Sequence, residues 1–163
     1  MLAALPDEEL PEVFVPIPSI DQIEQDFAVL EEWEDRYKYI IELGRELPEF
    51  DDAFRTQANK VQGCASQVWL QSFISDKDKD QPRLRFLGDS DALIVRGLIA
   101  IALSLFSGQP AQQIIAIDAS KELERLQLKE HLSPQRSNGF LSLIRRIKDD
   151  ARLAISDRVN SQA

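Results

Sequence analysis

Cys64 is the only cysteine in the 163-residue chain, and a thiolate is a strong nucleophile. It follows Gly63, a residue free to adopt the positive φ that sharp turns require. Val61 precedes this pair and Val68-Trp69-Leu70 follows it, and these residue types are typical of strands. Cys64 is therefore predicted to lie at a turn between two strands, where a thiol is able to meet another protein. The alternative is an unreactive structural thiol, because free cysteine commonly behaves as a small buried hydrophobe.

The residue inventory excludes several kinds of chemistry. A structural metal or iron–sulfur centre needs three or four soft or imidazole ligands, whereas the chain has one Cys and one His and no EF-hand spacing. A cysteine hydrolase needs a base, and the sole candidate, His131, precedes Ser133 at a predicted helix start. A one-cysteine peroxidase or thiol sensor stays open, as does an interaction module with Cys64 as structural filler. A single exposed thiol is also able to accept sulfur from a persulfide and pass it on.

Four segments of the chain, in order, resemble the SufE family of sulfur acceptors, which work beside cysteine desulfurases. Around the cysteine the matching residues are Val61-Gln62-Gly63-Cys64-Ala65-Ser66-Gln67-Val68-Trp69. The other segments are Trp33 with Arg36-Tyr37-Lys38-Tyr39-Ile40-Ile41-Glu42-Leu43-Gly44 and Leu47-Pro48; Gly88-Asp89-Ser90-Asp91-Ala92-Leu93-Ile94-Val95-Arg96-Gly97-Leu98; and His131-Leu132-Ser133-Pro134-Gln135-Arg136-Ser137-Asn138-Gly139. The resemblance covers about residues 23–151, and the first twenty residues have no counterpart in it.

The resemblance implies a function. A PLP-dependent cysteine desulfurase of the SufS or CsdA type removes sulfur from L-cysteine and holds it as a persulfide. The acceptor takes that sulfur on its own cysteine, here Cys64, stimulates the desulfurase and delivers the sulfur to a SufBCD-type scaffold. PLP belongs to the partner, so no cofactor or metal is expected on this chain. It would act as a sulfurtransferase-type carrier rather than as a stand-alone enzyme.

The resemblance also suggests supporting residues. Arg136, at the start of the last predicted helix, is the cation expected to favour the thiolate or persulfide; its alternative is a surface arginine or an ion pair. Asp91 is a candidate contact residue, and its alternative is helix capping together with Ser90. The residues expected to flank the cysteine loop or contact the partner are Gln62, Gly63 and Ser66.

The elements that position these residues follow from hydrophobic spacing and capping signals. Three strands, around residues 58–62, 66–74 and 83–87, are predicted to form an antiparallel sheet packed against helices, which makes an α+β, SufE/IscU-like domain. Ser19 and Gln22 form a capping-box signal, and Asp89 or Ser90 is expected to cap the helix that follows them. The predicted helices cover about residues 19–30, 33–44, 92–106, 110–117, 120–127 and 133–154.

The charge distribution divides the chain into parts. Residues 1–35 carry eleven acidic residues and no Lys or Arg, whereas the remainder carries 19 basic and 17 acidic residues. We therefore predict an acidic, proline-containing arm at 1–18, a domain at 19–156 and a frayed end at 157–163. The acidic start argues against a targeting peptide, so a cytoplasmic location is expected, or the plastid stroma after removal of a transit peptide. No basic face for nucleic acid and no membrane span is expected, and monomer and homodimer both stay open.

Overall fold

The sheet is built on an antiparallel pair of strands, β2 (Val68–Ser75) and β3 (Arg83–Ser90). The computed structural model describes residues 2–5, 17–75 and 81–162. A short strand, β1 (Leu2–Leu5), runs parallel to β2 along its other edge, so that the strand order is β1-β2-β3. The predicted α+β class with helices on an antiparallel sheet is confirmed, but the antiparallel part has two strands, not three.

The predicted strand at 58–62 is wrong, and turns on both sides of it explain why. Lys60 makes an isolated bridge to Trp69, and no ladder extends from it. Before the bridge, the backbone N–H groups of Asn59 and Lys60 donate to Thr56 and Gln57 in a turn. After it, Gly63 turns the chain with a φ of 89°. Two backbone hydrogen bonds flank the bridge, from the Val61 N–H to the Val68 carbonyl and from the Leu70 N–H to the Asn59 carbonyl, and the turns on either side end the pairing there.

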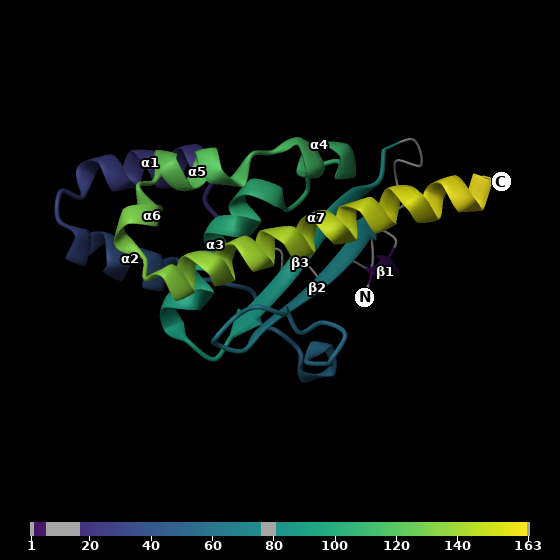
Figure 1. Ribbon diagram of the computed structural model, residues 1–163, viewed down its shortest axis with the longest axis horizontal. Helices are drawn as coiled ribbons and strands as arrows, with labels where there is room; N and C mark the ends of the chain where they lie inside the picture. Colours follow the sequence, from purple (N-terminus) through teal and green to yellow (C-terminus); the bar gives the residue numbers. More distant parts are fainter. Residues whose placement is uncertain (1, 6–16, 76–80, 163) are drawn as a thin grey trace.

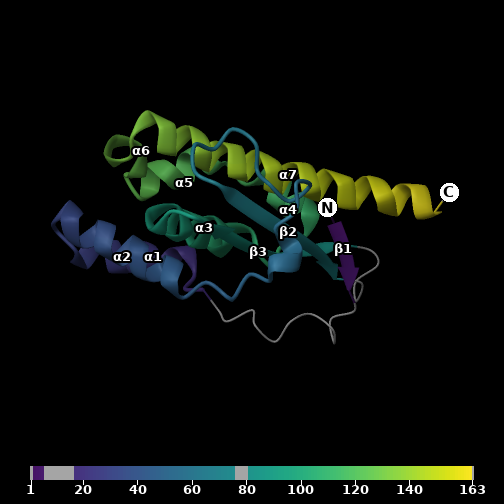
Figure 2. The ribbon, with the colours of Figure 1, turned by 90° about the horizontal axis from the view of Figure 1, so that it is seen from below.

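Two helices, α3 (Leu93–Phe106) and α7 (Pro134–Gln162), pack on the sheet face formed by Val68, Leu70, Leu84 and Phe86 (Figures 1 and 2). Two others, α1 (Ile20–Val29) and α2 (Trp33–Arg45), lie beyond the end of the sheet against α3. The remaining helices of the described residues are α4 (Ala111–Ala116), α5 (Ala119–Arg125) and α6 (Leu128–His131). The predicted capping box is confirmed, since the Ser19 hydroxyl accepts a hydrogen bond from the Gln22 N–H at 3.1 Å. The opposite sheet face packs on a smaller apolar cluster next to η1 (Asp52–Phe54).

Two glycines let α2 and α3 approach closely. A Cβ on Gly97 would lie 2.1 Å from the carbonyl oxygen of Ile40, and a Cβ on Gly44 would lie 2.5 Å from the backbone nitrogen of Gly97. Both contacts are with backbone, so neither position accepts a side chain without moving a helix. This crossing fixes α3, and α3 forms one wall of the site described below.

The longest helix, α7, crosses the sheet, and its last turns extend past the strands (Figures 1 and 2). The helix continues through residues 157–162, where fraying was expected. At the other end of the chain, part of the predicted arm forms β1, and residues 6–16 of that arm lie outside the described residues. The division into arm, domain and frayed end stays a prediction. Within the described ranges, no helix combines the length and the apolar character that crossing a membrane requires.

Candidate functional site

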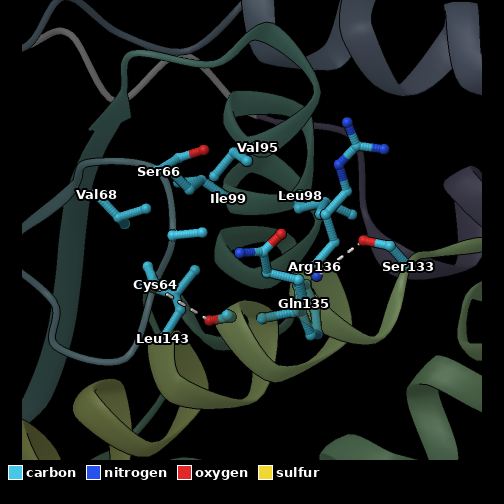
Figure 3. A pocket seen from close by; sticks show the side chains of 13 residues that line it. Cys64, Ser66, Val68, Val95, Leu98, Ile99, Ser133, Gln135, Arg136 and Leu143 are labelled. Carbon is cyan, nitrogen blue, oxygen red and sulfur yellow. Dashed lines mark hydrogen bonds between the residues drawn. The ribbon is translucent and has the colours of Figure 1, made fainter.

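Cys64 lies in a loop, residues 62–67, that leads into β2. The loop closes where the N–H of Val61 donates to the carbonyl of Val68 at 2.8 Å. Gly63 supplies the positive φ that the sequence predicted for a turn here. The cysteine therefore leaves the turn with its side chain directed toward α7 (Figure 3).

The thiol is half-buried and points at a helix backbone. Its S–H donates a weak hydrogen bond to the carbonyl oxygen of Gly139, with the sulfur 3.5 Å from that oxygen. Burial raises the pKa of the Cys64 thiol above its ordinary value, because the thiolate loses hydration. In this arrangement the thiol is predominantly protonated at neutral pH.

A pocket of about 320 Å³ opens beside the thiol (Figure 3). Its walls come from the cysteine loop, from the start of β2, from one side of α3 and from the first turns of α7. Most of the wall is apolar, formed by Ala65, Val68, Val95, Leu98, Ile99, Phe140 and Leu143. The polar side chains that line it are Ser66, Ser133, Gln135 and Arg136. A small group attached to the sulfur would enter a space with mostly apolar walls and an exposed polar margin.

The loop and α7 touch through two glycines. A Cβ on Gly63 would lie 2.6 Å from the Ser142 hydroxyl oxygen, so the loop backbone lies directly against the helix. A Cβ on Gly139 would lie 3.7 Å from the Cys64 sulfur, which is an ordinary contact distance. Gly63 is required by its φ of 89°, because the Ser142 hydroxyl is able to rotate away from an added Cβ, whereas Gly139 leaves space beside the sulfur.

A buried polar network holds α7 in place under the loop. Asp150 is 3% exposed and accepts hydrogen bonds from the Ser72 hydroxyl at 2.5 Å and from Arg146 Nε at 3.1 Å. Arg146 also donates to the carbonyl of Ala58 at 2.8 Å, just before the loop. The network joins β2, α7 and the segment entering the loop, so the position of Gly139 relative to Cys64 is fixed from both sides.

Asp91 binds the cysteine loop and does not cap a helix. Its carboxylate accepts a hydrogen bond from the N–H of Gln67 at 3.0 Å, and its own N–H donates to the carbonyl of Gln67 at 3.3 Å. The residue at the α3 N-cap is Ala92, which has no side-chain cap, and Asp89 pairs with arginines instead. The predicted capping of α3 by Asp89 or Ser90 is therefore wrong: Asp89 is held by its arginine partners, and the Ser90 hydroxyl accepts the N–H of Ala92 at 3.2 Å, before the helix begins.

Arg136 lines the pocket, but its guanidinium does not contact the thiol. The side chain is exposed, and Figure 3 shows it directed away from Cys64. Its backbone N–H donates to the Ser133 hydroxyl at 3.2 Å, which confirms Ser133 as a capping residue of α7. Within the described residues the guanidinium forms neither a hydrogen bond nor an ion pair, so the charge is available at the mouth of the pocket.

The remaining candidates divide into two groups. Ser66 lines the pocket, whereas Gln62 is exposed and does not line it. His131 also lies outside the pocket wall: its ring stacks on Trp33 with 3.5 Å between the ring centroids, and its carbonyl accepts a hydrogen bond from the Tyr37 hydroxyl. The structure therefore does not bring an imidazole to Cys64.

Sequence reasoning missed Gln135 and the wall contributed by α3. The signal for α7 was present, because residues 136, 139, 140 and 143 follow the spacing of one helical face. The α3 wall carried no local signal, since Val95, Leu98 and Ile99 read as ordinary core residues. In the described part of the chain no group of three or more His, Cys, Asp or Glu residues is placed to hold a metal ion.

Comparisons with known proteins show the family of the chain. The model of the SufE family, described as an Fe–S metabolism associated domain, matches residues 21–151. An uncharacterized SufE-like protein of Rhizobium meliloti (strain 1021) is 57% identical over 133 residues, which cover 82% of this chain and 94% of that protein. A second uncharacterized SufE-like protein, from Rhizobium etli, is 53% identical over 135 residues, covering 83% of this chain and 90% of the relative.

A solved structure shows the same fold at low sequence identity. It is the solution structure of a hypothetical protein from Thermus thermophilus, with a TM-score of 0.65 and 16% identity, covering 84% of this chain and 96% of that one. The family match over residues 21–151 and the two rhizobial relatives show that this chain belongs to the SufE family of Fe–S metabolism associated proteins.

Proposed function

We propose that the protein accepts sulfur from a PLP-dependent cysteine desulfurase of the SufS or CsdA type, stimulates that enzyme, and carries the sulfur as a persulfide on Cys64. The observation that carries the proposal is the placement of the lone thiol, half-buried at a loop turn beside a pocket with room for an added atom. Membership of a family associated with Fe–S metabolism supports the same conclusion. The sulfur would be delivered to a SufBCD-type scaffold.

The transfer step needs no group beyond the two cysteines. The thiolate of Cys64 attacks the outer sulfur of the partner's persulfide, and the bond between the partner's two sulfurs breaks. The partner cysteine leaves as a thiolate, and Cys64 carries the outer sulfur with its hydrogen. PLP chemistry occurs earlier and belongs to the desulfurase, so this chain serves as a sulfurtransferase-type carrier. The proposed location of this transfer is the cytoplasm.

The resting thiol is poorly prepared for this attack, which argues for a movement of the loop when the partner binds. The sulfur is directed at the Gly139 carbonyl and burial raises the pKa of the thiol. Moving residues 62–67 away from α7 would expose the sulfur and restore its hydration. Arg136, exposed at the pocket mouth with an unpaired guanidinium within the described residues, is placed to contact the partner or the anionic sulfur on its way in.

Intact mass spectrometry after mixing the protein with a cysteine desulfurase and L-cysteine tests the proposal. We expect the protein to gain the mass of one sulfur atom, at Cys64, and to raise desulfurase turnover. Cys64→Ser should remove both effects without changing the circular dichroism spectrum or the unfolding midpoint, and Arg136→Ala should slow sulfur uptake more than it lowers stability.

Two results would contradict the proposal. Full stimulation of the desulfurase by Cys64→Ser would show that the thiol is not the acceptor. Consumption of peroxide by the wild-type protein, with no sulfur gained from the desulfurase, would favour a one-cysteine peroxidase instead.

A further inference from the structure

The polar margin of the Cys64 pocket contains one side chain that fits an anionic sulfur. The argument rests on the proposed function, because it concerns the persulfide that Cys64 would carry. A persulfide adds a second sulfur beyond Sγ, and the pocket of about 320 Å³ is the space next to that atom. The outer sulfur is more acidic than a thiol and is therefore largely anionic near neutral pH.

An anion in this pocket needs a hydrogen-bond donor. The walls from α3, β2 and α7 are apolar, and an unpaired charge against such walls is strongly disfavoured. The raised pKa of the Cys64 thiol reflects the same effect on the inner sulfur. Without a donor, the persulfide would have to protonate or leave the pocket.

Among the four polar side chains that line the pocket, Gln135 is the one aimed into it. Figure 3 shows its amide between Cys64 and the wall formed by α3, whereas the Arg136 guanidinium points away and the Ser66 hydroxyl lies near Val95. The Ser133 hydroxyl accepts the N–H of Arg136 and lies on the far side of Arg136 from Cys64 in Figure 3. Within the described residues the Gln135 amide has no hydrogen-bond partner, so its N–H groups are free to donate.

We propose that the side-chain amide of Gln135 donates a hydrogen bond to the outer sulfur of the Cys64 persulfide and keeps it anionic inside the pocket. This contact protects the carried sulfur from small thiols. A small thiolate removes the sulfur by attacking the protonated outer atom: the S–S bond breaks, Cys64 leaves as a thiolate, and the sulfur departs with its hydrogen on the small molecule. The anionic form repels that attack, so a donor that favours the anion lengthens the life of the persulfide.

The test compares Gln135→Met with wild type after both are loaded by a cysteine desulfurase and L-cysteine and then separated from the enzyme. Each loaded protein is mixed with glutathione, and loss of the extra sulfur is followed by intact mass spectrometry. A hydrogen bond to a charged group corresponds to about a tenfold change or more in an equilibrium constant when it is shielded from water, but Gln135 is exposed and water competes for its amide, so we expect roughly fivefold faster loss from Gln135→Met. The unloaded thiols should react with iodoacetamide at equal rates, because the amide acts on the outer sulfur.

A matched control is Asn138→Leu, which removes an amide from the same helix three residues later. Asn138 lines a different pocket, together with Leu123, Leu132 and Leu141. The Cys64 persulfide of Asn138→Leu should therefore survive as long as that of wild type. Equal half-lives for Gln135→Met and wild type would overturn the inference. So would a parallel rise in the alkylation rate of unloaded Gln135→Met, which would make Gln135 a simple steric cover. If wild type gains no sulfur, the proposed function itself has failed.

Discussion

The Asp91 carboxylate forms a hydrogen bond that holds the cysteine loop closed at its β2 end, and removing this carboxylate should expose the thiol more often. The carboxylate accepts the Gln67 N–H at 3.0 Å, while the second link, from the Asp91 N–H to the Gln67 carbonyl, is made by backbone alone. Asp91→Ala therefore removes one link and leaves the other. The Val61–Val68 backbone hydrogen bond at the base of the loop is untouched.

The expected size of the effect follows from this hydrogen bond. Bonds to a charged acceptor contribute about 1.5–3 kcal/mol in general, but Asp91 is exposed and water competes for both groups, so about 1 kcal/mol is a suitable value here. A change of about 1 kcal/mol in the closed state multiplies the open fraction of the loop by roughly five. The free energy of unfolding should fall by no more than about the same 1 kcal/mol.

The rate of alkylation of Cys64 by iodoacetamide, measured across pH to separate exposure from ionisation, reports the open fraction. We expect the plateau rate of Asp91→Ala to exceed that of wild type by roughly fivefold. Asp91→Asn keeps a carbonyl acceptor but loses the charge, so its rate should lie much nearer to wild type. The reasoning fails if Asp91→Ala reacts at the wild-type rate, or if Asp91→Asn is as fast as Asp91→Ala.

Three further predictions follow from close contacts and burial. Gly97→Ala should lower the free energy of unfolding by about 3 kcal/mol in urea titrations, since its Cβ would meet the Ile40 carbonyl at 2.1 Å; a loss below about 1 kcal/mol would contradict the tight crossing. Gly139→Ala should instead raise the free energy of unfolding by up to about 1 kcal/mol in the same assay, because its Cβ would meet the Cys64 sulfur at an ordinary 3.7 Å and alanine favours helix. The alkylation of Cys64 in the folded protein should rise with a midpoint above the ordinary thiol pKa of about 8.5, and a midpoint at or below that of the urea-unfolded chain would refute the effect of burial.

Local signals in the sequence predicted most of the helices and the position of the turn that carries Cys64. Ser19 and Ser133 each accept a backbone N–H at a helix start, as their positions indicated. Gly63 adopts the positive φ expected beside the cysteine. These features depend on neighbours within a few residues, so a local pattern is enough to identify them.

Features that depend on distant partners were not predictable in the same way. β1 pairs with β2 across some seventy residues of sequence, and Leu2–Leu5 carries no strong strand signal of its own. Asp91 read as a helix cap because the backbone N–H of Gln67 that it binds comes from a separate loop. The pocket beside Cys64 likewise exists only because the Gly44–Gly97 crossing fixes α3 and the Asp150 network fixes α7.

The contacts that half-bury the resting thiol and raise its pKa offer a way to couple its activation to the proposed partner. Each unit by which burial raises the thiol pKa reduces the thiolate fraction tenfold at neutral pH, which also limits side reactions with oxidants. The constraint is local: the thiol donates to the Gly139 carbonyl, and Asp91 ties the end of the loop. In the proposed function, a desulfurase that binds the loop away from α7 breaks the contact to Gly139 and rehydrates the sulfur in one movement. Exposure and ionisation would then rise together only in the complex, so reactivity toward sulfur would depend on the presence of the enzyme that supplies it.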